Sequence, residues 1–188
     1  MKNISLILFL GLLLAACNPK AKMVEEAFGK MEDMSQIGTV EYTITKLIIA
    51  NDNSLFKFGD RKIVFSCKAT MKAGIDLKDF SKEDVEITNN GKNVTLNLPY
   101  PKVLAFNMPA DQVKLEYSKV SGMRDGYNTE ERNELLKQGE AAILSDASTI
   151  GIIEDAKKNA TDFFTMLLAH CQFENINVCF KDTTTVKK

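Results

Sequence analysis

The hydrophobic positions of the chain follow three successive patterns. Residues 4–14 are almost continuously apolar, and residues 39–45 and 63–73 alternate between apolar and polar side chains. The residues after Asn128 place apolar side chains three and four positions apart. A period of two is typical of half-buried strands, and the longer spacing is typical of amphipathic helices. The order predicts an α+β fold: a mainly antiparallel sheet built from hairpins, covered by two C-terminal helices, with a final short strand.

The strand pattern is clearest in residues 63–73, where every second side chain is apolar and lysines occur in between, with Val64 out of pattern. Residues 39–45 alternate in the same way and the strand continues through Leu47-Ile48-Ile49, so the two strands are expected to form a long hairpin. Its tip carries three large apolar side chains, Leu55, Phe56 and Phe58. These could contact a partner or a membrane, or they could fold back on their own sheet.

A second hairpin has a readable register. Asn90-Gly91 is a strong signal for a two-residue turn, and counting outward pairs Ile87 with Val94 and Val85 with Leu96. Pro99 and Pro101 end the second strand of this hairpin, because proline lacks the backbone donor. Two further strands are expected at residues 103–107 and 113–117.

Two helices follow. Asn128 can cap the first, with Glu131 completing a capping box, and this helix is expected to end around residues 148–151. A last strand is expected at residues 173–181. The predicted apolar stripe of the second helix is Ile153, Ala156, Ala160, Phe164, Leu167 and Cys171.

The amino-terminal apolar run resembles a bacterial lipoprotein signal peptide. It follows Lys2 and leads into Leu14-Ala15-Ala16-Cys17. The run is about half the ~20 residues that a membrane-spanning helix needs, and a small-residue cleavage site follows it. We therefore expect residues 1–16 to be removed and Cys17 to carry lipid, since two or three acyl chains hold a protein firmly on a membrane. The alternatives are an ordinary secretory signal that contains a cysteine, or an uncleaved core segment.

This interpretation divides the chain into four parts. Residues 17–35 are the lipid anchor, tether and a short helix, residues 36–182 are expected to form a single α+β domain, and residues 183–188 are a polar tail. Asn18, rather than an aspartate, follows the lipidated cysteine, which permits an outer-membrane location facing the periplasm.

Charge and motifs narrow the function classes. The chain has 24 basic and 25 acidic residues, a net charge of −1, so nothing strongly basic is available for nucleic acid. The sequence carries no phosphate-binding loop, zinc-ligand spacing, nucleophile elbow or dinucleotide fingerprint. We therefore expect no cofactor, no metal site and no nucleic-acid partner.

The remaining cysteines, His170 and Asp76 could have either a structural or a chemical role. Cys171 and Cys179 flank the turn into the last strand and could form a disulfide, while Cys67 could pair with either or stay a buried, inert thiol. His170 points to a different helix face from Cys171, which suits neither a catalytic dyad nor a shared metal. Asp76 could cap a short turn or act as a catalytic carboxylate.

Several motifs in order resemble the bacterial domain of unknown function 4230 family, over about residues 37–180. They are Ala73-Gly74-Ile75-Asp76-Leu77, then Leu98-Pro99 with Pro101, then Ile150-Gly151-Ile152-Ile153-Glu154-Asp155-Ala156 with Asn159-Ala160. The chain departs from the family at Cys67, where an aromatic is usual, and at Cys171-Gln172, where a glycine is expected. The resemblance implies the α+β order and a cell-envelope setting, and it brings no reaction and no catalytic residue.

The sequence favours a non-enzymatic binding or scaffolding lipoprotein of unknown molecular function. Such a protein would be anchored to the membrane through the lipid on Cys17 and would bind another envelope protein through its sheet or the hairpin tip. The alternative is an envelope hydrolase, in which carboxylates such as Asp111 and Glu116 meet other acids in a cleft.

Overall fold

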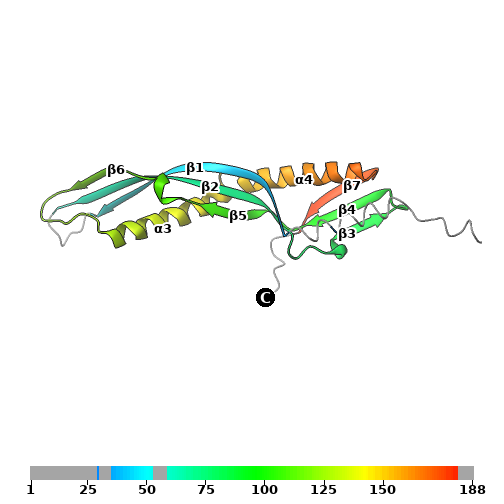
Figure 1. Cartoon of the computed structure of the whole chain (residues 1–188), viewed down its shortest axis with the longest axis horizontal. Helices are drawn as coiled ribbons and strands as arrows, with labels where there is room; N and C mark the ends of the chain where they lie inside the picture. Colours follow the sequence, from blue (N-terminus) through cyan, green and yellow to red (C-terminus); the bar gives the residue numbers. More distant parts are fainter. Residues whose placement is uncertain (1–28, 30–34, 53–58, 182–188) are drawn as a thin grey trace, which may run out of the picture. The chain divides into compact units, whose positions relative to one another are not determined.

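The computed structural model describes Gly29 and residues 35–52 and 59–181 (Figure 1). The predicted signal peptide, Cys17, the tip residues Leu55, Phe56 and Phe58, and the polar tail lie outside the described residues. No described helix is long and apolar enough to cross a membrane.

The chain divides into two compact units, where we expected a single domain over residues 36–182. Unit 2 consists of Gln36–Asp76 and Pro101–Ala160, and unit 1 of Met1–Ser35, Leu77–Tyr100 and Thr161–Lys188. Each unit has its own sheet and is described by itself.

Sheet A of unit 2 is built around strand β2 (Arg61–Asp76). Strand β1 (Gln36–Asp52) pairs antiparallel with one edge of β2 along its whole length. Strands β5 (Lys102–Asn107) and β6 (Val113–Val120) pair antiparallel with the other edge, one after the other, joined through the short helix η2 (Ala110–Gln112). β2 is therefore hydrogen-bonded on both sides, and the expected long hairpin is confirmed.

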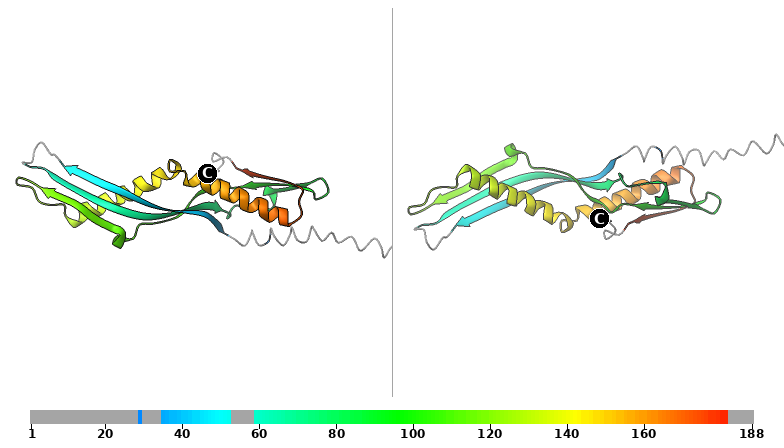
Figure 2. Two further views of the ribbon diagram at one scale, coloured as in Figure 1. Left: turned by 90° about the horizontal axis from the view of Figure 1, so that it is seen from above. Right: turned by 90° about the horizontal axis from the view of Figure 1, so that it is seen from below.

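Helix α3 (Thr129–Ser145) covers one face of sheet A, as the views from above and below show (Figure 2). The short helix η3 (Asp146–Ser148) follows it. The side chains of β2 on this face are buried in two clusters. One cluster comprises Ala69, Met71, Ala73, Ile143, Ala147, Ile152 and Ala156, and the other Ile63, Phe65, Cys67 and Tyr127.

The predicted cap of α3 is confirmed. The Glu131 backbone amide donates to Asn128 Oδ1 at 2.9 Å, and the Asn128 amide donates to Glu131 Oε2 at 2.9 Å. Farther along α3, Gly139 is buried against Ile48 of β1. The absence of a side chain at this glycine allows the helix to lie close to the sheet.

Sheet B of unit 1 has the order β3-β4-β7. Strands β3 (Val85–Thr88) and β4 (Asn93–Leu98) form the second hairpin with the predicted register, in which Val85 lies opposite Leu96. The short helix η1 (Lys82–Asp84) directly precedes β3 in the chain. Strand β7 (Asn175–Phe180) adds to β4 in parallel. The predicted α+β class, with mainly antiparallel strand pairing, two C-terminal helices and a final short strand, is confirmed.

The buried stripe of helix α4 (Ile152–His170) differs from the predicted one at two positions. The buried side chains include Ile152 and Leu168, whereas Ile153 and Leu167 are only half-buried. Both adjacent positions are apolar in each pair, so the periodicity alone cannot choose between them. Ala156, Ala160, Phe164 and Cys171 are buried as predicted.

A side chain at position 139 should weaken the packing of α3 on sheet A. A Cβ there would lie 1.8 Å from Ile48 Cδ1 and 2.7 Å from Ile48 Cγ1. Overpacking of this kind costs about 1–3 kcal/mol, so Gly139→Val should lower the urea midpoint of unfolding, followed by circular dichroism.

The control for this variant is Gln138→Val at the exposed neighbouring position, which introduces the same side chain away from the contact with Ile48. Adding Ile48→Ala to Gly139→Val should recover part of the loss by making room for the new side chain. Equal midpoints for Gly139→Val and Gln138→Val would refute the close approach.

Candidate functional site

A cluster of charged side chains closes the end of the β1–β2 hairpin next to the tip. Arg61 Nε donates to Asp52 Oδ2 at 2.9 Å, and its two terminal nitrogens donate to the Glu131 carboxylate at 2.6 and 3.0 Å. The Arg61 guanidinium also lies over the Tyr127 ring, 4.3 Å from its centre. The fork of Arg61 therefore joins β1, β2 and the first turn of α3.

A second arginine completes this arginine cluster, which we define as Asp52, Arg61, Arg124 and Glu131. The Arg124 side chain is only 4% exposed and forms an ion pair with Asp52. Arg124 Nη1 also donates to the Gly59 carbonyl oxygen at 3.4 Å. Gly59 has a positive φ of 105°, and a Cβ there would lie 2.0 Å from the Ser121 carbonyl oxygen. The backbone at the base of the tip is thus fixed from both sides.

The electrostatics of the arginine cluster favour a structural role. The hydrogen bond from Arg61 is the main cause that lowers the pKa of Asp52, and it is also the main cause that lowers the pKa of Glu131. The same contacts raise the pKa of Arg61 above its usual value. A general acid at neutral pH needs a raised carboxyl pKa, so the cluster has the opposite properties.

Two further polar contacts tie β1 to the helices on the covered face. The Tyr42 hydroxyl donates to Asp155 Oδ2 at 2.5 Å, and this hydrogen bond is the main cause that raises the pKa of Tyr42. Lys46 Nζ contacts Asp146 Oδ2 at 2.5 Å and the Ala142 carbonyl oxygen at 3.5 Å, at the C-terminal end of α3. A cation is favourable at that end of a helix. Both contacts hold sheet A against the helices that pack on it.

The opposite face of sheet A carries exposed apolar side chains. We call it the outer face: the side chains of β1, β2 and β6 that alternate with the buried ones. Leu47 and Ile49 on β1 are 58% and 54% exposed, and Tyr117 on β6 is 47% exposed. Ile49 lies opposite Val64, and Val64 lies opposite Tyr117, so three strands contribute to one apolar row.

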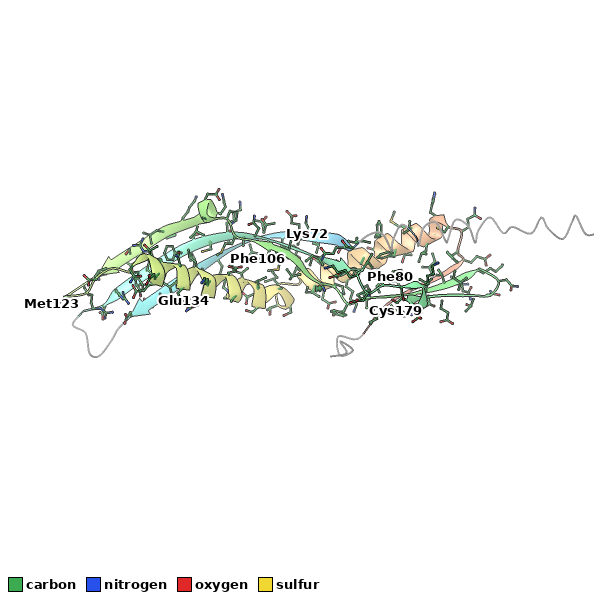
Figure 3. The ribbon with its side chains drawn as sticks, turned by 60° about the horizontal axis from the view of Figure 1, so that its bottom comes forward. Lys72, Phe80, Phe106, Met123, Glu134 and Cys179 are labelled. Carbon is green, nitrogen blue, oxygen red and sulfur yellow. The ribbon has the colours of Figure 1, made fainter. Side chains whose placement is uncertain are left out.

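Lysines lie on both sides of this apolar row. On one side Lys62 lies directly opposite Lys119, and on the other side Lys114 lies opposite Ser66, next to Lys68 along β2. All four lysines are exposed. Lys72, labelled in Figure 3, belongs to the same face and pairs with Glu41 at 3.3 Å. The outer face therefore combines an apolar centre with a basic surround.

The predicted site residues within the described part of the chain lie in environments typical of residues that stabilise the fold. Cys67 is fully buried, and this burial raises the pKa of its thiol. Asp76 forms an ion pair with Lys102 at 2.9 Å. The turn that we expected Asp76 to cap is present, because the Phe80 amide donates to the Leu77 carbonyl oxygen at 3.0 Å. The cap itself stays a prediction.

Cys171 and Cys179 are both free thiols in the structure. Cys171 is buried, whereas Cys179 (Figure 3) lies opposite Asn97 and alternates with Val178 and Phe180 along β7. The register gives Cys179 the side of sheet B opposite to the buried side chains of β4, which does not favour a bond to Cys171. The predicted disulfide stays a prediction.

The described residues contain no group of three or more histidine, cysteine, aspartate or glutamate side chains that could hold a metal ion. Among these residues, the arginine cluster and the outer face are the two features with a distinctive chemistry. Sequence reasoning did not identify the arginine cluster, and it named the sheet as a contact surface without the residues of the outer face. The outer face did leave a signal, because Val64 and the continuous run of Leu47, Ile48 and Ile49 interrupt the alternation.

Comparison with known families identifies the chain. A family profile described as "Protein of unknown function (DUF4230)" matches residues 29–178. The chain belongs to this family. No curated protein and no solved structure shows a significant match. Membership of the DUF4230 family agrees with the resemblance seen in the sequence motifs and assigns no reaction.

The arginine cluster should make the stability of the chain depend on acid pH. Because the pKa values of Asp52 and Glu131 are lowered in the folded state, the unfolded chain binds protons more readily. The stabilisation is therefore complete above the ordinary carboxyl pKa of about 4 and is lost as the pH falls through the folded-state values. The urea midpoint should decrease between about pH 5 and pH 2, and Asp52→Asn/Glu131→Gln should flatten this decrease.

The control pair for the pH series is Glu116→Gln/Glu140→Gln, which removes two exposed carboxylates from the same unit. It should keep the pH dependence of the wild-type chain. A double Asp52/Glu131 variant with the full wild-type slope would mean that the arginine cluster does not hold the hairpin.

Proposed function

We propose that this DUF4230 protein is a lipid-anchored, non-enzymatic binding or scaffolding protein of the bacterial cell envelope. It is held at the outer membrane, facing the periplasm, by lipid on Cys17, and it meets an envelope partner through the outer face of sheet A. The observation that carries the proposal is the apolar row of Ile49, Val64 and Tyr117, in which Ile49 and Tyr117 are exposed and Val64 is half-buried.

Exposure of the apolar row to water is unfavourable in free energy unless a partner covers it. Each apolar side chain removed from water contributes favourable free energy in proportion to its buried area. Leu47 and Ile49 leave more than half of their surface in water. Contiguous exposed apolar side chains with a polar surround are typical of interaction surfaces in soluble domains.

The arginine cluster supports this proposal, because a binding surface on two long strands needs a fixed geometry. Asp52 and Arg61 stand at the end of the hairpin nearest the outer-face row, and both are held by charge-assisted hydrogen bonds. Such bonds are about twice as strong as neutral ones. They keep the register of β1 and β2, and with it the positions of Ile49 and Val64.

The signal-peptide pattern at residues 1–17 supports the location. Lipid on Cys17 would keep the domain within reach of envelope components, which raises their effective concentration. No observation on the described residues favours the hydrolase that we considered from the sequence. Asp111 contacts its neighbour Gln112 at 3.2 Å, and Glu116 is exposed on β6.

Fractionation and crosslinking in intact cells test the two parts of the proposal. Wild-type protein should sediment with membranes, and Cys17→Ala should release it, because the acyl chains supply most of the membrane affinity. A photoreactive amino acid in place of Tyr117 should capture an envelope component in the wild-type background.

The matched crosslinking control replaces Lys137, an exposed residue of α3, with the same photoreactive amino acid. It should capture markedly less. Equal capture from positions 117 and 137 would contradict the outer face as the working surface, and unchanged sedimentation of Cys17→Ala would contradict the anchor.

A further inference from the structure

We propose that the partner of the outer face is the anionic surface of a lipid bilayer, on which sheet A lies flat. The inference rests on the proposed function and names the partner of that same surface. The phosphate groups of the lipids would bind the lysines, and the interfacial region of the bilayer would take up the apolar row.

The charge of the outer face is complementary to that of an anionic bilayer. Lys62, Lys68, Lys114 and Lys119 form no ion pair with any residue that the structure describes. Lys62 and Lys119 are direct cross-strand neighbours on β2 and β6. Like charges in that arrangement are unfavourable. An anionic layer opposite the sheet would remove this repulsion, and a lysine near such a surface gains attraction.

The order of side chains across the strands also suits a bilayer surface. The row of Ile49, Val64 and Tyr117 has the Lys62–Lys119 pair on one side and Lys114 on the other. Lysine side chains can extend their charged ends to the phosphates while their stems cover apolar surface. Tyrosine has an apolar ring and a polar hydroxyl, which suits the boundary between headgroups and acyl chains.

The segment between Cys17 and β1 is short enough to keep sheet A near the bilayer. About 20 residues separate Cys17 from the start of β1, and a chain of that length spans at most roughly 70 Å. Lipid on Cys17 would therefore hold the outer face close enough to contact the same bilayer. An acidic protein is the other partner that this surface could accept, and the experiment separates the two.

A single tryptophan can report the contact, because the chain contains none. The full chain carrying Tyr117→Trp, extracted from cells and mixed with phosphatidylcholine vesicles with or without phosphatidylglycerol, is measured by fluorescence. With the anionic lipid present, we expect a blue shift of the emission and quenching by brominated acyl chains. Adding Lys62→Gln/Lys119→Gln should weaken this binding roughly 10- to 30-fold.

Two controls match these variants. Lys137→Gln/Lys158→Gln removes the same charge from exposed positions on the helices of unit 2 and should leave the quenching unchanged. A reporter placed as Lys137→Trp on α3 should stay unquenched, because that side of the unit faces away from the outer face.

The outcomes distinguish a failure of sheet A to bind the bilayer from a failure of the lipid anchor. Vesicles that recruit the chain without quenching of the Tyr117→Trp reporter would leave the lipid anchor intact and overturn the docking of sheet A. Equal quenching with and without phosphatidylglycerol, or in the Lys62/Lys119 variant, would overturn the role of charge. Crosslinks from position 117 in cells to a protein and none to lipid would assign the surface to a protein partner instead.

Discussion

The architecture of unit 2 depends on the two-sided pairing of β2. Because β1 occupies one edge of β2 and β5 and β6 occupy the other, the backbone of β2 is satisfied and its side chains must alternate between two faces. α3 covers only one of them (Figure 2). The other face is left to solvent or to a partner, and its composition of apolar and basic side chains follows from that position.

Two local devices maintain this arrangement. Gly139 lets α3 approach β1 at Ile48, so the cover lies close against the sheet. At the hairpin end, Arg61 joins β1, β2 and α3 through Asp52 and Glu131. Buried or half-buried arginines of this kind are stabilising only when their charge is paired in good geometry. The cluster satisfies that condition with carboxylates from separate elements and uses no group that is poised for catalysis.

Local chemistry made much of this fold predictable. The Asn90-Gly91 turn determined the register of β3 and β4, and Asn128 with Glu131 determined the start of α3, because each signal acts between near neighbours. The parallel pairing of β4 with β7 joins residues more than 70 positions apart, and so does the Arg124–Asp52 contact, while Arg61 and Glu131 are 70 positions apart. No local pattern encodes these contacts. The outer-face row was visible only as an interruption at Val64, since its meaning depends on Ile49 and Tyr117 on other strands.

The central claim is that the outer face is covered in the cell and open in the isolated chain. Maleimide labelling of Ile49→Cys in a Cys179→Ser background measures this directly, because Cys67 and Cys171 are buried. The account predicts rapid labelling of the purified protein and clearly slower labelling in intact cells, with Lys137→Cys labelled at similar rates in both. Equal rates for Ile49→Cys in the two settings would contradict it.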